Sequence, residues 1–142
     1  MATISNTDTH DNTVEQGKTY IETFTCQVLT NPALPWDSIT NPYIPLDLTT
    51  YNVRMQVRKT YDTATTEIYA VNLTTTGAVI RFTKVNNTGV ITLTLIPEDT
   101  ANLRFTGDSA TYVYDIELAH TTQDIVLLVS KGSFIINRES TR

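Results

Sequence analysis

The stretch YNVRMQVRK, residues 51–59, alternates apolar and polar side chains with a period of two. Successive side chains of a β-strand point to opposite faces of a sheet, so this period predicts a strand with one buried face and one face in water. The residues expected in the core are Tyr51, Val53, Met55 and Val57, and those expected in water are Asn52, Arg54, Gln56 and Arg58.

Further short β-rich stretches lie on both sides of this strand, with turn sequences such as TTTG, NNTG and FTGDS between them. They are KTYIETFTCQVL (18–29), TEIYAVNL (66–73), AVIRFTK (78–84), GVITLTLI (89–96), TYVYDIELA (111–119), DIVLLV (124–129) and SFIIN (133–137). We expect Lys131 and Gly132 to form a bulge or kink between the last two. Strands at about ten-residue spacing predict an all-β sandwich of seven to nine strands.

The strand phases also predict which side chains form the core and where the chain is helical. The expected core comprises Val53, Met55, Val57, Leu93, Leu95, Tyr114, Ile116 and Phe134. One short helical turn is expected near 97–103, because Pro97 suits a first helical position and the acidic residues Glu98 and Asp99 favour a helix N-terminus.

Two segments depart from the strand pattern. Residues 1–16 are polar and rich in Thr, Asn and Asp, so we expect an arm that is mobile by itself, followed by a sandwich domain over residues 17–142. The segment NPALPWDSITNPYIPLDLTT, residues 31–50, holds four of the five prolines and the only tryptophan. Proline lacks the N–H that a sheet needs, so this segment is expected to be a long loop.

Length, charge and cysteine content restrict the function. A chain of 142 residues suits one domain, and its net charge of -5 argues against nucleic-acid binding, which depends on Lys and Arg. No apolar run has the ~20 residues of a membrane span, and residues 1–17 lack the features of a signal peptide, so we expect a cytosolic origin. Cys26 is the only cysteine, so neither an intrachain disulfide nor a cysteine-based zinc site is expected.

The stretch YVYDIEL, residues 112–118, holds two carboxylates that resemble a catalytic pair. Asp115 and Glu117 lie two positions apart, on the same face of the expected strand and opposite the apolar residues. Acid–base chemistry needs a cleft and a pKa shifted by burial, and we expect neither on an outward strand face. We therefore interpret the pair as the wet side of a strand, and expect Arg54 and Arg58 beside it.

No other group of residues predicts a catalytic, metal or cofactor site. The two histidines are His10 in the arm and His120 at an expected strand end, which leaves no sequence argument for a metal site or a catalytic triad. The sequons at Asn72 and Asn86 are expected by chance in a threonine-rich chain.

Five segments together resemble a small structural domain that recurs in tailed bacteriophages, notably cyanophage-like and other marine phages. They are QGKTYIETFTCQ (16–27), DLTTYNVRMQVRK (47–59), GVITLTLIPEDTANL (89–103), YVYDIELA (112–119) and LLVSKGSFIINRESTR (127–142). The resemblance covers residues 16–142 and implies a single immunoglobulin-like (Ig-like) antiparallel β-sandwich without catalytic residues. The N-terminal arm and the long proline-rich loop depart from the family pattern. The segment PEDTA also occurs in antibody variable domains, but five residues carry no weight.

The resemblance implies a virion structural protein of the neck, tail, baseplate or head surface, assembled in the host cytoplasm. Its expected partners are other virion proteins and further copies of the chain. The candidate interface comprises His10, Val14, Trp36, Tyr43 and Ile44, in the arm and the proline-rich loop. Two other interpretations remain. Trp36, Tyr43 and Ile44 would cap one end of the sandwich, or Trp36 and Tyr43 would stack on a sugar in a carbohydrate-binding or adhesin module.

Overall fold

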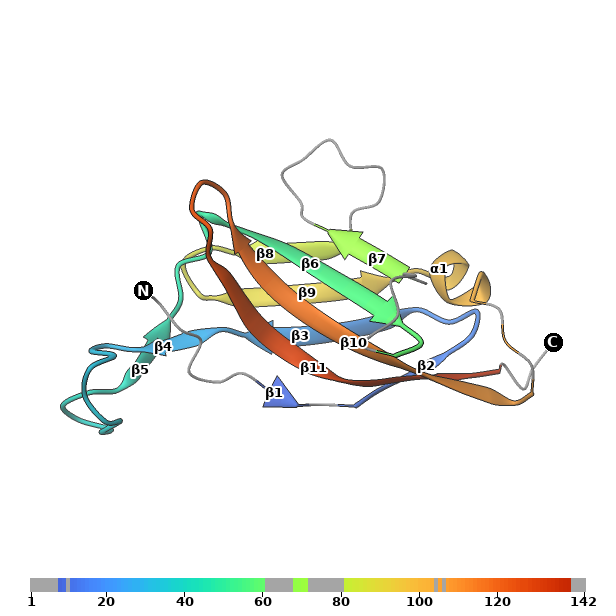
Figure 1. Ribbon diagram of the computed structural model, residues 1–142, viewed down its shortest axis with the longest axis horizontal. Helices are drawn as coiled ribbons and strands as arrows, with labels where there is room; N and C mark the ends of the chain where they lie inside the picture. The colour runs from blue at the N-terminus through green and yellow to red at the C-terminus, as the bar shows by residue number, and fades with distance from the viewer. Residues whose placement is uncertain are drawn as a thin grey trace.

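The protein is an all-β sandwich with one short helix. The computed structural model describes residues 8–9, 11–60, 68–71, 81–103, 105 and 107–138, with the backbone alone for 8–9 and 68–71. Strands β1 to β11 form two facing sheets and a separate two-stranded hairpin (Figure 1). The described residues form eleven strands, more than the expected seven to nine. The N-terminal arm contributes β1 and β2, the proline-rich segment contributes one short strand, and the segment 18–29 divides into two strands.

The larger sheet has the strand order β1-β11-β10-β6-β7, and β2 also pairs with β11. The strands are β1 (Asp8–Thr9), β2 (Asn12–Glu15), β6 (Tyr51–Arg58), β7 (Ile68–Val71), β10 (Ser109–His120) and β11 (Val126–Asn137). The long antiparallel strands β6, β10 and β11 lie at its centre, whereas β1 and β2 pair with β11 in parallel.

The smaller sheet has the order β3-β9-β8, formed by β3 (Tyr20–Thr25), β8 (Phe82–Val85) and β9 (Val90–Leu95). Taken in chain order, β3, β8 and β9 correspond to strands B, D and E of an Ig-like sandwich, and β6, β10 and β11 to strands C, F and G. The structure therefore has the Ig-like distribution of strands between two sheets. Helix α1 (Pro97–Ala101) connects β9 to β10, as expected.

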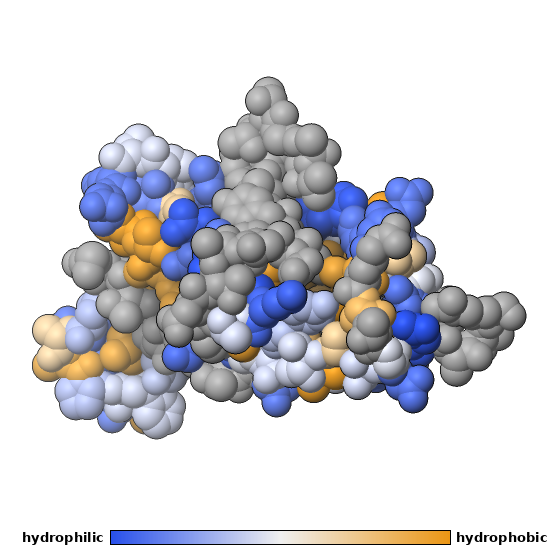
Figure 2. All heavy atoms as spheres, turned by 45° about the vertical axis from the view of Figure 1, so that its right-hand side comes forward, coloured by the Kyte–Doolittle hydropathy of each residue, from blue (hydrophilic) through white to orange (hydrophobic). Residues whose placement is uncertain are grey.

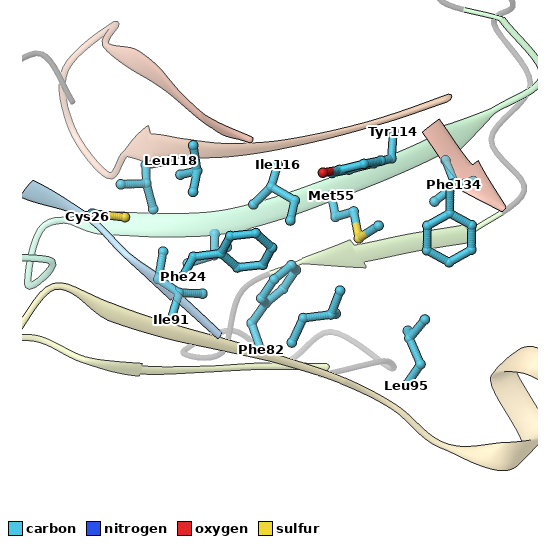
Figure 3. Close-up of a cluster of buried hydrophobic side chains, with 14 of the residues drawn as sticks. Phe24, Cys26, Met55, Phe82, Ile91, Leu95, Tyr114, Ile116, Leu118 and Phe134 are labelled. Atoms are coloured by element: carbon cyan, nitrogen blue, oxygen red, sulfur yellow. The ribbon is translucent and has the colours of Figure 1, made fainter. Parts of the chain in front are cut away.

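The core between the sheets contains every residue that the strand phases predicted. Val53, Met55, Val57, Leu93, Leu95, Tyr114, Ile116 and Phe134 are all buried, and Figure 3 shows their neighbours Phe24, Phe82 and Ile91 from the smaller sheet. The rings of Tyr114 and Phe134 meet edge to face, with centroids 6.4 Å apart. The buried Tyr114 hydroxyl is satisfied by Ser130 Oγ at 2.9 Å.

The N-terminal boundary predicted at residue 16 is wrong. Residues 12–15 form β2, and Val14 is buried in the core. Gln16 Nε2 donates to the Leu103 carbonyl at 2.9 Å, and the Gly17 amide donates to Thr100 Oγ1 at 2.9 Å. The sandwich therefore includes residues that the polar composition assigned to a mobile arm.

Two strand boundaries also differ from the prediction. The segment 18–29 is not one strand, because the chain leaves the smaller sheet at Cys26 and β4 (Gln27–Leu29) pairs with β5 (Tyr43–Pro45) instead. The two strands expected at 124–129 and 133–137 are one strand, β11, which continues through Lys131 and Gly132. The irregularity in its pairing with β10 lies between Ile116 and Glu117, which face Ser130 and Leu128.

Candidate functional site

The proline-rich segment forms a β-hairpin that extends from one end of the sandwich (Figure 1). Strands β4 and β5 pair from Gln27 opposite Pro45 to Leu29 opposite Tyr43. The Leu46 amide donates to the Cys26 carbonyl at 2.9 Å where the hairpin meets the sandwich. The prediction of a loop without strands is therefore wrong. Prolines are tolerated here because both strands are short and neither joins a larger sheet.

Asn41 holds the tip of this hairpin together, and it is 2% exposed. Its side-chain nitrogen contacts the carbonyls of Asn31, Leu34 and Pro35 at 2.9–3.0 Å. Its side-chain oxygen accepts from the Asn31 amide at 2.7 Å. One side chain thus satisfies backbone groups that proline and the tight path of the chain leave without strand partners.

Asp37 forms the turn at the far end of the hairpin. Its backbone exchanges two hydrogen bonds with Asn41, each 3.0 Å long. Its carboxylate accepts from the amides of Thr40 and Ile39, and these bonds lower the pKa of Asp37. The tip therefore has its own network of hydrogen bonds, which fixes the backbone from which its apolar side chains project.

Large apolar side chains gather on the outside of this hairpin. The exposed fractions are 54% for Leu34, 55% for Trp36, 89% for Ile39, 41% for Tyr43 and 41% for Ile44. We call these five residues the hairpin patch. Figure 2 shows hydrophobic atoms gathered at the end of the molecule where Figure 1 places the hairpin. An ordered apolar surface that water covers is a candidate interaction site.

The aromatic rings of the hairpin patch contact each other instead of the sandwich. Trp36 and Tyr43 stack with ring centroids 6.1 Å apart and an angle of 24° between their planes. Their exposure rules out the interpretation that Trp36, Tyr43 and Ile44 seal one end of the core. The stack presents a preformed aromatic surface.

The structure separates the residues predicted for the interface. It brings Trp36, Tyr43 and Ile44 together on the hairpin, but Val14 is 1% exposed in the core and is unavailable to a partner. His10 lies outside the described residues. The sequence analysis missed Leu34 and Ile39. The sequence feature that could have predicted them is that each is a single large apolar residue among prolines and polar turn residues.

The carboxylates of YVYDIEL lie on the outer face of the larger sheet, beside β6, as predicted. Glu117 faces Arg54 across the β6–β10 pair, and Arg54 Nε lies 3.2 Å from Glu117 Oε1. Arg58 instead contacts Gln56, whose backbone is opposite Asp115. The face is a network of opposite charges, which stabilises strand register more than it provides chemistry.

Asp115 differs from the expectation in one respect. Burial raises the pKa of Asp115, with a further increase from Glu117 and opposing effects from Arg58 and Arg54. The prediction that an outward face leaves the pKa unshifted is therefore wrong. Asp115 lies between Gln56 of β6 and Lys131 of β11 in the sheet, and burial in this position disfavours the charged carboxylate.

No group of three metal-binding side chains occurs within the residues that the structure describes. His120 packs edge to face on Tyr51, and its Nδ1 accepts from the amides of Thr122 and Gln123, so it closes a turn. The helical part of the described chain contains nothing long and apolar enough to cross a membrane. Asn86 lies in an exposed turn, whereas Asn72 falls outside the described residues.

Comparison with known proteins leaves the sequence and the fold as the basis for function. No protein-family model matches the chain, and no curated protein matches it in sequence.

Proposed function

We propose that this chain is a non-enzymatic structural protein of a tailed-bacteriophage virion, in the neck, tail, baseplate or head surface. The five segments that resemble a phage structural domain support the class, and the Ig-like distribution of strands agrees with what that resemblance implies. The sandwich acts as a rigid body that carries an attachment element.

The hairpin patch is the observation that carries this proposal. Its residues are exposed while the turn that bears them is fixed by Asn41 and Asp37. Preorganisation reduces the conformational entropy that binding removes, and Trp and Tyr are frequent anchors of protein interfaces. The hairpin has one acidic residue, Asp37, and no Lys or Arg, so its partner offers an apolar cleft and not a charged surface.

Mass spectrometry of purified phage particles tests the proposal. Particles are collected from host cells in which the tagged chain is produced during infection. The chain should be found in the particles in a fixed ratio to the major coat protein. Its absence from washed particles would overturn the proposal.

Variants of the hairpin patch test the attachment element. Trp36→Ala combined with Ile39→Ser should lower incorporation into particles without unfolding the sandwich, because both side chains are more than half exposed. Val126→Ser is the matched control, since Val126 is an exposed apolar residue on β11, outside the hairpin. Equal incorporation of both variants would show that the hairpin is not the attachment element.

A carbohydrate-binding module is the second candidate, and the exposed stack of Trp36 and Tyr43 favours it. The other large exposed side chains of the hairpin, Leu34 and Ile39, are apolar, whereas a sugar site needs polar groups that orient hydroxyls. A glycan array separates the candidates. Binding that Trp36→Ala abolishes would support the sugar module, whereas no binding would leave the protein interface.

A further inference from the structure

The turn between β10 and β11 is closed by a histidine side chain. His120 Nδ1 lies 3.1 Å from the Thr122 amide nitrogen and 3.0 Å from the Gln123 amide nitrogen. The Thr122 hydroxyl lies 3.4 Å from the same ring atom. A backbone amide can only donate a hydrogen bond, so Nδ1 accepts through its lone pair and carries no proton in this arrangement. The closed turn therefore requires the neutral imidazole.

The tip of the hairpin has a turn of the same kind with a different acceptor. Asp37 accepts from the amides two and three residues further along the chain, those of Ile39 and Thr40, at 2.9 and 3.0 Å. His120 accepts from the amides at the same two offsets. Asp and Asn side chains hold turns in this way because their oxygen reaches the backbone. At His120 an imidazole takes the place of that oxygen.

The acceptor on His120 is lost when its ring gains a proton. A protonated imidazole donates from both nitrogens and accepts at neither. Histidine is the side chain whose ordinary charge change falls between about pH 5 and 8. In contrast, hydrogen bonds from Thr40 and Ile39 lower the pKa of Asp37, so its carboxylate remains an acceptor over this range. Mild acid therefore acts on the turn at His120 and not on the turn at Asp37.

His120 lies at the end of the core, where water reaches it. The residue follows Ile116 and Leu118 in the inward phase of β10 and is half-buried. Its ring meets the Tyr51 ring edge to face, with centroids 5.3 Å apart. Residues 121–124, which the ring closes into a turn, are all exposed. Protonation of the ring and movement of the turn therefore do not require the core to open.

The other titratable groups near this turn come from the elements around it. The turn itself carries Asp124, β6 carries Tyr51, the segment before β6 carries Asp47, and β11 begins with four apolar residues. Lys84 on β8 donates to the Tyr51 carbonyl at 2.8 Å. Burial lowers the pKa of Lys84, with an opposing effect of Asp47. The experiment therefore has to separate Asp124 and Lys84 from His120.

The turn is connected to the segment that leads to the hairpin. The Thr121 amide donates to the Thr50 carbonyl at 2.9 Å, and Thr50 lies between β5 and β6. Figure 1 shows the turn between β10 and β11 at the end of the sandwich from which the hairpin extends. The closed turn therefore supports the segment that joins the hairpin to the larger sheet.

We propose that His120 is an acid-sensitive latch, which holds the turn between β10 and β11 closed while its ring is neutral and releases it on protonation. The two forms differ by one proton on Nδ1, which comes from water and returns to it. Release leaves the Thr122 and Gln123 amides to water and weakens the bond between Thr121 and Thr50. This inference does not depend on the proposed function. It makes the end of the molecule that carries the hairpin responsive to mild acid.

NMR spectroscopy of the whole chain tests the latch. Exchange of each amide proton with water is compared with its intrinsic rate at the same pH, which gives a protection factor. The protection factors of Thr122 and Gln123 should fall at least about tenfold between about pH 8 and about pH 5, because two hydrogen bonds are lost. The midpoint of this fall should match that of the His120 ring signals. His10, the other histidine, is identified by comparison with His10→Gln.

The turn at Asp37 provides a control within the same molecule. The protection factors of Ile39 and Thr40 should stay constant over the range in which those of Thr122 and Gln123 fall. A parallel fall at both turns would show a general loosening in acid and would overturn the proposal. Constant protection of Thr122 and Gln123 while the His120 ring titrates would overturn it as well. These outcomes need only the natural chain, so they do not depend on the folding of a variant.

Variants assign the effect to His120. His120→Asn is the matched variant, because its side-chain oxygen can accept from the same two amides and does not titrate. Its turn should stay protected at every pH, whereas His120→Ala should leave the turn poorly protected at every pH. Melting temperatures establish that each variant is folded. A fall in protection that persists in His120→Asn would contradict the latch.

Two further variants exclude the neighbouring charges. Asp124→Asn removes the carboxylate of the turn, and Lys84→Arg keeps a positive charge that does not titrate near neutral pH. Both variants should retain the fall in protection with the midpoint of the natural chain. Loss of the transition in either variant would assign the pH dependence to that neighbour and overturn the role of His120.

Discussion

Asp115 and Glu117 lie two residues apart on β10 but contribute differently to stability. Glu117 accepts from Arg54, whereas burial raises the pKa of Asp115 above its ordinary value of 3.8. A raised pKa means that the folded state favours protonated Asp115. Its contribution to stability is therefore complete below pH 3.8 and is lost as the pH rises through the pKa of the folded state.

Asp115→Asn should not lower the free energy of unfolding at neutral pH, because it removes a carboxylate that is costly to ionise in the folded state. Glu117→Gln should lower it by about 0.2–1 kcal/mol through loss of the ion pair with Arg54. Urea unfolding at neutral pH measures the free energy of unfolding of both variants. A larger loss for Asp115→Asn than for Glu117→Gln would show that Asp115 forms a stabilising ion pair.

Arg81 and Asp99 form an ion pair that is better shielded from water than the pair of Arg54 and Glu117. Arg81 Nε lies 2.5 Å from Asp99 Oδ2, and Arg81 Nη2 lies 2.8 Å from Asp99 Oδ1. Burial alone would raise the pKa of Asp99. The hydrogen bonds from Arg81 and the Ile96 amide, with the charge of Arg81, outweigh burial and lower it.

Asp99→Asn should lower the free energy of unfolding by about 1.5–3 kcal/mol at neutral pH, the usual value of a hydrogen bond to a charged group. A lowered pKa gives stability that is present above pH 3.8 and is lost as the pH falls through the folded-state pKa. Urea unfolding as a function of pH should show the difference between variant and natural chain shrinking in acid. Glu98→Gln, on the exposed side of the same helix, is the control and should cost less than about 0.5 kcal/mol. A pH-independent difference would contradict this electrostatic explanation.

The turn between β8 and β9 depends on Gly89, the last residue of the predicted turn sequence NNTG. Gly89 has a φ of 69°, and its carbonyl accepts from the Cys26 amide at 2.7 Å. A Cβ at this position would lie 2.3 Å from the Cys26 carbonyl oxygen. The close approach of the backbone at the base of the hairpin therefore excludes any side chain.

Gly89→Ala should destabilise the protein more than Gly107→Ala. Both positions have positive φ, which costs an L-residue about 1 kcal/mol, but a Cβ at Gly107 meets nothing within 4 Å. The difference between the two losses in free energy of unfolding measures the clash of the added Cβ with the backbone of Cys26 and Leu46. Equal losses in free energy of unfolding for the two variants would show that the backbone around Gly89 shifts to make room for the methyl group.

The N-terminal strand shows why sequence patterns missed part of the fold. In β2 the buried positions are Asn12 and Val14, so a polar residue occupies one of the two core positions. The Asn12 side-chain oxygen accepts from the Tyr20 hydroxyl at 2.6 Å, whereas its side-chain nitrogen is buried without a hydrogen-bond partner among the described residues. A buried asparagine interrupts the alternation of apolar and polar residues from which strands are predicted. The strands β6, β9 and β10 have this alternation and were predicted correctly.

Deletion of residues 1–16 should lower the melting temperature or prevent folding, because it removes β2 and the buried Val14 from the edge of β11. Deletion of residues 1–7 should leave the melting temperature close to that of the natural chain. Val14→Ala should cost about 2 kcal/mol, the value of two buried carbons with some cavity. A stable product of the longer deletion would show that β2 is dispensable.

The hairpin was less accessible to prediction than the strands of the core. Proline content, Trp36 and Tyr43 predicted an unusual segment, but its shape depends on contacts of the Asn41 side chain with three backbone carbonyls. Such side-chain to backbone bonds have no period along the sequence. The aromatic part of the candidate site was therefore predictable, and its extension from the sandwich was not.

The whole molecule divides its surface by chemistry. The larger sheet presents charged side chains on its outer face, and the hairpin patch lies at one end of the sandwich. A sandwich with a hydrated, charged face and an apolar projection suits a component that is attached to a larger assembly through that projection. This division of the surface is the physical basis of the proposed virion role.

A density map of the assembled phage particle tests that role most directly. We expect the map to contain the sandwich in several copies, each with its hairpin inserted into a neighbouring protein, so that Trp36 and Ile39 lose most of their exposure. A particle that lacks the chain, or one in which the tip of every hairpin lies in solvent, would contradict the account.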